Sequence, residues 1–369
     1  MEASAVANSP QKSVRYAALD VARGLAVLGA AFIHSMIACQ LWSEVPQTWW
    51  KGALNIGFRA VTPTFFVIFG VMLELVYVRR AEAGDAVAGR LLRRAGLCWI
   101  GFAAGSVTAA LVGSIAPSKA LAAVILLGDA PWTSVLRFYT IALVLAIGIV
   151  HLRIRRGRLV PWYLLAGVWA LSPLLGHLPL WLSGKGEALR FLWGSTFGTP
   201  AIWVGGSVWH NLSFVAMGMI LGSSMRARSQ LGQSPFPVGM AVLLSAMCLC
   251  VLAGCAMVED PFTLARQYAG DRMALRTAHH PAYYAGGGLS ALILLGVIFA
   301  MVRGDGGFWA EVGRRSLLVF AISGVLLNLA PARFEPGLAL GCLLAAVHMA
   351  ILIAVVAVSR RRAGMAHDR

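Results

Sequence analysis

The amino-acid sequence predicts an all-α integral membrane protein with about ten transmembrane helices and both termini in the cytoplasm. Only 12% of the 369 residues are charged and 59% are hydrophobic, which excludes an ordinary soluble domain. Apolar runs long enough to cross a bilayer recur along the whole chain. Basic residues gather in alternate loops between these runs, as the positive-inside rule expects of a multi-pass protein.

Ten apolar segments carry the expected spans. They cover residues 19–42, 57–78, 94–114, 132–150, 159–176, 200–222, 236–258, 282–302, 315–330 and 337–358. Residues 119–128 are also apolar but too few to cross, so we expect an interfacial or re-entrant segment there. The chain then divides into an N-terminal tail (1–18), a single transmembrane domain (19–358) and a basic C-terminal tail (359–369). The N-terminal tail lacks the apolar core of a cleaved signal peptide.

The distribution of charge tests the number of spans. With the N-terminus inside, twenty Lys and Arg residues fall in cytoplasmic segments and eight in outer segments. One span more or fewer would reverse every later loop, so this bias indicates an even number. The net charge of +16 therefore indicates basic loops that meet anionic lipid headgroups, and no nucleic acid partner is expected.

Arg59 and Arg137 lie just inside their spans, and we expect both to snorkel to the interface.

The first span carries three ionisable residues on one stripe: Asp20, Arg23 and His34. On an α-helix, Arg23 and His34 lie within about 20° of the same face and about 16 Å apart along the axis, with Asp20 one turn before Arg23. Ionisable groups inside a bilayer are costly and usually functional. A neutral imidazole can take a proton from an acceptor hydroxyl and return it to a leaving group. We therefore predict a catalytic stripe; the alternative is that His34 is a packed core residue.

Three arginines lie at the cytoplasmic start of the third span. Arg90 and Arg94 share a helix face one turn apart, and Arg93 is adjacent to them. Guanidinium groups suit phosphate, because their planar donors bind its oxygens two at a time. This cluster predicts a docking site for a phosphorylated cytosolic donor. A cluster that serves only as a topology signal is the alternative.

Polar and aromatic residues also gather on the expected outer side. Trp209, His210 and Asn211 lie near the outer end of the sixth span, where they are candidates to orient an acceptor. We interpret His279 and His280, in the longest outer loop, as a solvated pair. Eight of the twelve tryptophans map to the outer half, either as an interfacial belt or as a platform for sugar rings. Further outer polar groups are Asp129, Glu187 and Asp271.

Several segments resemble the membrane-bound acyltransferase 3 families, in the order that those families show. LDVARGLAVLGAAFIHS (19–35) resembles their L-D-x-x-R-G-x-A opening, which is followed by a histidine late in the first helix. TPTFFVIFGVML (62–73) is similar to their F-F-x-x-S-G helix, with Phe69 where serine is usual, and RLLRRAG (90–96) to their R-x-x-R segment. VLRFYTIALVL, VWHNLSFVAMGMILG and VGRRSLLVFAISGVLL resemble successive segments of the OpgC branch, which is similar to glucan succinyltransferases.

This resemblance implies a membrane O-acyltransferase of the bacterial inner membrane. It implies transfer of an acetyl- or succinyl-class acyl group from cytosolic acyl-CoA to a hydroxyl of an extracytoplasmic glycan or a similar acceptor. By the same resemblance, His34 matches the essential histidine and Arg23 the family's arginine. Acyl-CoA is then a co-substrate, and no permanently bound cofactor is expected. The sequence departs from the OpgC pattern after the histidine, where Ser35-Met36-Ile37 replaces I-P-G-N, which leaves the identity of the substrate open.

Two other functional classes stay open. A transporter or flippase of a polar or acylated substrate also needs polar residues in the membrane, although the chain shows no internal repeat or inverted symmetry. A sensor or scaffold would use the charged stripe in salt bridges between helices. The six cysteines lie within or beside apolar spans without metal-ligand spacing, so we interpret them as packing residues and predict no metal site.

Overall fold

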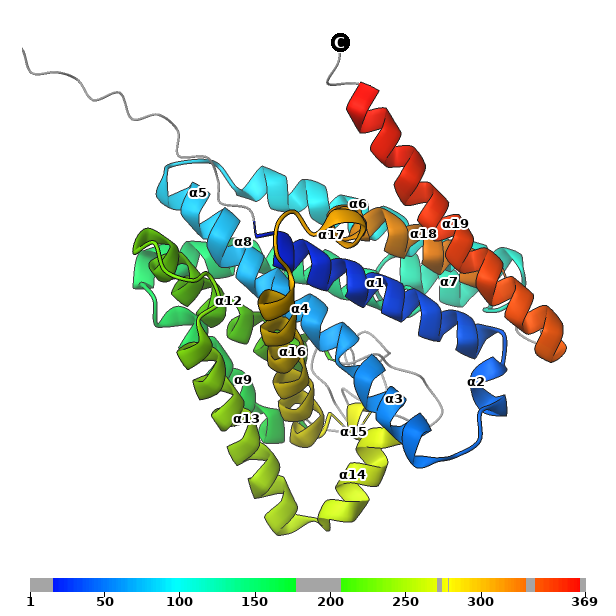
Figure 1. Cartoon of the computed structure of the whole chain (residues 1–369), viewed down its shortest axis with the longest axis horizontal. Coiled ribbons are helices and arrows are strands. Elements are labelled where there is room, and N and C mark those ends of the chain that lie inside the picture. Colours follow the sequence, from blue (N-terminus) through cyan, green and yellow to red (C-terminus); the bar gives the residue numbers. More distant parts are fainter. Residues whose placement is uncertain (1–15, 177–206, 271–273, 278, 330–335, 366–369) are drawn as a thin grey trace, which may run out of the picture.

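The computed structural model describes residues 16–176, 207–270, 274–277, 279–329 and 336–365, and these residues form helices and short loops without a β-strand (Figure 1). The first half contains α1 (Ala17–Ala38), α2 (Leu41–Glu44), α3 (Trp49–Arg59), α4 (Val61–Met72), the π-helix η1 (Leu73–Val78), α5 (Arg79–Glu82), α6 (Ala88–Leu111), α7 (Pro117–Val124), α8 (Ser134–Arg156) and α9 (Val160–Gly176). The second half contains α12 (Val208–Gln230), α13 (Val238–Val258), α14 (Pro261–Ala269), α15 (Ala274–Thr277), α16 (Pro281–Met301), α17 (Gly307–Arg314), α18 (Ser316–Asn328) and α19 (Gly337–Met365).

The predicted all-α membrane fold is confirmed. Within the described ranges, seven helical segments are long and apolar enough to cross a membrane, and α9 and α18 are shorter apolar helices. Together with α12, these helices overlap all ten expected spans. The short segment α7 falls where we expected a stretch that does not cross.

Several helices run beyond their expected limits, including α6, which begins at Ala88, and α8, which ends at Arg156. The second span belongs to a longer helical segment, Trp49–Glu82, because no glycine or proline interrupts its cytoplasmic end. α12 continues to Gln230 instead of ending at 222, and α19 continues to Met365 through most of the predicted tail. Residues 200–206, where the sixth span was expected to begin, lie outside the described residues, as do the outer residues Glu187 and Asp271.

α4 and α12 form the centre of the bundle, and α1, α8, α9 and α16 pack around them (Figure 1). Gly70 of α4 and Gly218 of α12 let the two backbones meet, because a Cβ at either position would overlap a carbonyl oxygen of the other helix. Small residues allow this close approach in membranes, where dispersion contacts between helices replace the hydrophobic effect. The pair α4–α12 is therefore the rigid support against which the other helices are placed.

The buried arginines of α3 and α8 have partners within the protein. Arg137 is fully buried, with Nη2 3.2 Å from Asp129 and Nη1 donating to the Gly128 carbonyl oxygen. Arg59 is 7% exposed; it donates to the Gly270 carbonyl oxygen and lies over the Tyr268 ring. The expectation that both arginines snorkel is therefore wrong, because each finds acceptors within the protein.

A buried ion pair joins η1 to α8 near the cytoplasmic ends of these helices. Nη2 of Arg153 lies 2.6 Å from Oε1 of Glu74, and both side chains are buried. Removing one partner of such a pair leaves an uncompensated charge, which costs about 3–5 kcal/mol. The pair therefore fixes the π-helix, and with it the side chains that η1 presents to the cavity described below.

Candidate active site

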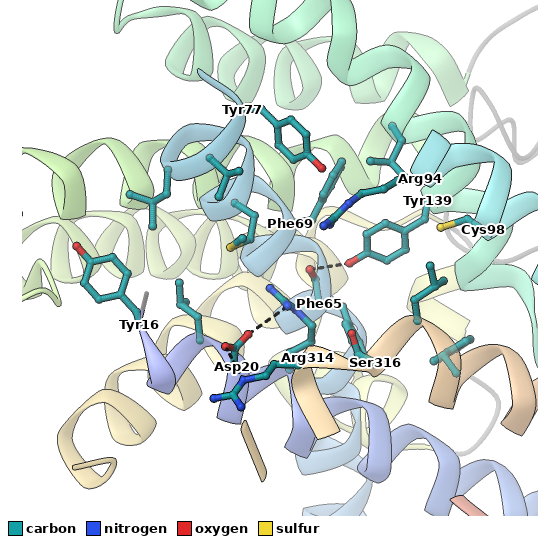
Figure 2. A pocket seen from close by; sticks show the side chains of 18 of the residues that line it. Tyr16, Asp20, Phe65, Phe69, Tyr77, Arg94, Cys98, Tyr139, Arg314 and Ser316 are labelled. Carbon is teal, nitrogen blue, oxygen red and sulfur yellow. Dashed lines mark hydrogen bonds and ion pairs between the residues drawn. The ribbon is translucent and has the colours of Figure 1, made fainter. Parts of the chain in front are cut away.

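One large cavity opens among the helix ends that the charge distribution places in the cytoplasm. Its volume is about 820 Å³, within the range of small-molecule sites. Side chains from α1, α4, η1, α5, α6, α8, α12, α17 and α18 line it (Figure 2). The cavity is thus built from both halves of the chain, around the inner end of the charged stripe.

Five arginines and one carboxylate give the cavity its charge. They are Arg23, Arg79, Arg94, Arg226, Arg314 and Asp20. Figure 2 shows Arg94 reaching in from one wall, between Tyr77 and Tyr139, while Arg314 stands beside Asp20 at another wall. Guanidinium groups that converge on one space can bind a ligand with several phosphate or carboxylate oxygens.

Asp20 contacts two of these arginines. Its Oδ1 lies 3.4 Å from Nη1 of Arg23, and its Oδ2 lies 3.8 Å from Nε of Arg314. Glu311 also holds Arg314, with 2.7 Å between Oε2 and Nη1. α17 comes this close to α1 because Gly313 packs on the backbone carbonyl of Asp20, where a Cβ would overlap it. Asp20 therefore orients cationic groups from two helices at the cavity wall.

The rest of the lining is mainly aromatic and aliphatic. It includes Phe65, Phe69, Leu136, Leu143 and Phe320. The hydroxyl of Tyr139 donates to the Phe65 carbonyl oxygen at 2.9 Å, which fixes that ring at the wall. The π-helix η1 turns Leu75, Val76 and Tyr77 to the cavity, and π-turns of this kind occur frequently at functional sites. The cavity thus offers both a cationic and an apolar surface to a ligand.

His34 lies further along α1, about 16 Å from Arg23 along the axis, and is absent from the described lining of the cavity. Its ring contacts Trp132, with 5.3 Å between the ring centroids. The backbone of Trp132 has φ of +62°, which is rare for a bulky residue and typical of functional sites when it occurs. Leu136, four residues later, lines the cavity. The segment from Trp132 to Leu136 therefore connects the surroundings of His34 with the cavity wall.

A second polar cluster lies on the outer side, where α12 and α16 begin. The ring of His210 stacks on His279 and on Tyr284, with centroids 5.1 Å apart in both cases. Nδ1 of His279 lies 3.2 Å from the Tyr284 hydroxyl. Nδ1 of His210 and Nε1 of Trp209 are buried and have no hydrogen-bond partner in the described structure. Asn211, the next residue on α12, is also buried.

The interpretation of His279 and His280 as a solvated pair is wrong for His279. Its side chain is buried, and burial, together with the stacked His210 and with Arg276, lowers the pKa of His279 to about 3. His280 instead lies 2.8 Å from a carboxylate oxygen of Glu259.

The predicted donor-site residues separate in the structure. Arg94 lines the cavity together with Asp20 and Arg23, whereas Arg90 and Arg93 are exposed and lie outside its described lining. Helical periodicity placed Arg90 and Arg94 on one face, but it did not show how far that face extends along the cavity. Arg94 is therefore the member of the predicted cluster best placed to meet a ligand there.

Arg79, Arg226 and Arg314 were not predicted as site residues, because the positive-inside rule already accounted for them as loop charges. Arg226 reaches the cavity because α12 continues through SSMRARSQ, a stretch without glycine or proline to end the helix. That lack of a stop signal was the available clue. For Trp132, neither the contact with His34 nor the positive φ has a signature in the sequence.

Residues 15–192 match the family model described as heparan-alpha-glucosaminide N-acetyltransferase, catalytic. The matched segment holds α1 to α9, and so includes His34, Arg23, Arg94 and the wall residue Tyr139. No curated protein sequence matches the chain. The family match supports an acyltransferase-type activity in a membrane protein, while the OpgC branch stays a prediction.

Proposed function

We propose that the protein is a membrane acyltransferase that takes an acyl group from acyl-CoA in the arginine-lined cavity and delivers it to an acceptor on the opposite face. The observation that carries this proposal is the arrangement along α1. Asp20 and Arg23 stand in a cationic cavity at its inner end, and His34 stands about 16 Å away, beside Trp132. One helix thus serves a donor site and an acceptor site.

The cavity suits the chemistry of acyl-CoA. Its arginines match the phosphates of the nucleotide part, and the apolar wall suits the pantetheine arm and a short acyl chain. An extended arm of roughly 15–20 Å would bring the thioester from the cavity to the level of His34. The acyl group would pass the wall formed by Phe65 and Leu136 to reach that level. Asp20 would act by orienting Arg23 and Arg314 toward the donor phosphates.

In the transfer step, His34 acts as the general base. Its unprotonated ring nitrogen takes the proton of the acceptor hydroxyl, and the oxygen attacks the thioester carbonyl carbon. The carbon–sulfur bond breaks, and the CoA thiolate takes the proton back from His34. Trp209, His210 and Asn211 would hold the acceptor on the outer side. The cytoplasmic membrane of a bacterium, with acyl-CoA inside and a glycan outside, provides both substrates in this arrangement.

The matched family model names an N-acetyltransferase that acts on a glucosaminide. For the present chain, an amine of an amino sugar is therefore an acceptor to test beside a glycan hydroxyl. The two products differ chemically, because hydroxylamine cleaves an ester and leaves an amide intact. The acceptor can thus be assigned from the stability of the labelled product.

The experiment is transfer of radiolabel from acetyl-CoA and succinyl-CoA in membranes that contain the wild-type protein or the variants His34→Ala and His34→Gln. We expect both variants to lose transfer by a factor of about 10²–10⁴, the usual contribution of a general base. His151→Ala is the matched control, because His151 is an exposed histidine outside the cavity lining. Full transfer by His34→Ala, at equal protein in the membrane, would refute the proposed function of His34.

A further inference from the structure

Ser35, the residue after His34, makes a hydrogen bond that joins α1 to α19. Its side chain is fully buried, and its Oγ lies 2.5 Å from Nδ1 of His348. The same Oγ donates to the Ala31 carbonyl oxygen one turn back, at 2.7 Å. The hydroxyl thus has one contact within its own helix and one with a helix that lies more than 300 residues later in the chain (Figure 1).

The two contacts determine which atom carries each proton. A serine hydroxyl has one proton, and that proton goes to the Ala31 carbonyl. The oxygen is therefore the acceptor of the second bond, and Nδ1 of His348 is the donor. Nε2 of His348 is buried and has no hydrogen-bond partner among the described residues. The ring is consequently oriented through Nδ1 alone.

This contact lies where few residues of α1 are buried. Up to Ala31 many residues of α1 are buried, but in the last seven positions Ser35 is the only buried one. The inner half of the helix is fixed by α17. The turn that bears His34 contacts Phe58 through Phe32, Trp132 through His34 and His348 through Ser35, and only the last of these contacts is a hydrogen bond. The Ser35–His348 hydrogen bond therefore limits the rotation of this turn.

We propose that Ser35 and His348 are a positioning pair, which holds the outer turn of α1 so that His34 meets the reacting acyl group. This inference rests on the proposed function of His34 as the base. A shift of about 1 Å in a catalytic group can lower the rate roughly a hundredfold. The pair also makes α19 part of the catalytic unit, although the family match ends at residue 192.

The test is steady-state acyl transfer by Ser35→Ala and His348→Leu in membranes, with acyl-CoA as the varied substrate. We expect kcat to fall roughly tenfold to a hundredfold, while KM for acyl-CoA stays within about twofold, because the donor cavity lies further in. All rates are referred to the amount of folded protein in the membrane, because a loss of folded protein lowers the apparent kcat and leaves KM unchanged. A kcat that returns to the wild-type value after this correction would refute the positioning role.

Two further variants make the test specific. An asparagine at 348 places an amide N–H near the position of Nδ1, whereas a glutamine places it near Nε2. His348→Asn should therefore recover kcat to within about threefold of wild type, and His348→Gln should not. Ser106→Ala is the matched control, because Ser106 is equally buried and donates to the carbonyl four residues back, at 2.8 Å. This control should keep wild-type kcat.

The failure of this inference is distinguishable from failure of the proposed function. If His34→Ala abolishes transfer while Ser35→Ala and His348→Leu keep wild-type kcat, the positioning pair is refuted and the base is retained. Equal losses in His348→Asn and His348→Gln would also refute it, because the additional methylene of glutamine moves the donor away from the position of Nδ1. Full transfer by His34→Ala would instead overturn the proposed function itself.

Discussion

At the residue scale, the arginines that we expect in the cytoplasm fall into two groups. A subset lines the cavity, and the positive-inside rule accounts for the others. Arg93 and Arg94 show the difference within one helical turn, because both are exposed cations but only Arg94 is in the described lining. A comparison of these two neighbours therefore tests the proposed role of Arg94 in ligand binding apart from any role in membrane topology.

We predict that Arg94→Ala raises KM for acyl-CoA about tenfold or more, because a charge-assisted hydrogen bond contributes about 1.5–3 kcal/mol. Arg93→Ala should change KM less than about twofold. Initial rates over a range of acyl-CoA concentrations measure both values. Equal effects of the two substitutions on KM would contradict a specific role of Arg94 in binding acyl-CoA.

The carboxylate of Glu311 lies on the short helix α17. Burial raises the pKa of Glu311, but hydrogen bonds from Arg315 and Arg314 outweigh this effect, so the net pKa lies below its ordinary value of 4.5. A lowered pKa stabilises the folded state above the unfolded-state value, and this contribution is lost as the pH falls through the folded-state pKa.

We therefore predict that Glu311→Gln lowers the melting temperature in detergent at pH 7, and that its difference from wild type disappears as the pH falls below about 4.5. Thermal unfolding between pH 3.5 and pH 8 measures this difference. Glu44→Gln, at an exposed carboxylate on α2, is the control and should match wild type throughout. A difference in melting temperature that grows as the pH falls would contradict the stabilising role of the Glu311 carboxylate.

At the scale of elements, the contact between α17 and α1 builds one wall of the cavity. We predict that Gly313→Ala destabilises the protein by about 1–3 kcal/mol, the usual cost of overpacking, because its Cβ would overlap the backbone of Asp20. The same displacement should raise KM for acyl-CoA, since Arg314 follows directly. Gly96→Ala is the control, because a Cβ there meets no atom within 4 Å. Equal thermal stability of Gly313→Ala and wild type would refute this role of the contact.

The sequence predicted the helices well, since apolar runs and alternating loop charge are local properties that the bilayer enforces. It placed Asp20, Arg23 and Arg94 at span ends on the same side of the membrane, and the structure brings all three into one cavity. It did not predict Arg226 and Arg314 in the cavity, because that depends on how far α12 extends and on how α17 folds back onto α1. The buried state of Arg137 also escaped prediction, since its partner Asp129 lies in a loop.

At the scale of the whole molecule, the two ends of the bundle differ in chemistry. One end holds the cavity with its five arginines, and the other end holds His34, Trp132 and the stacked pair His210 and His279. Between the two ends, the closely packed helices α4 and α12 fill the centre of the bundle. This asymmetry is the expected form of an enzyme whose donor and acceptor occupy opposite sides of a membrane.

The most direct test is transfer in proteoliposomes that hold the protein in one known orientation. Labelled acyl-CoA is supplied on one side and the acceptor on the other, and the label on the acceptor is measured. We predict labelling only when acyl-CoA is on the side of the arginine-lined cavity and the acceptor is on the side of His34, with no labelling by His34→Ala. Labelling that requires both substrates on the same side would contradict transfer across the membrane.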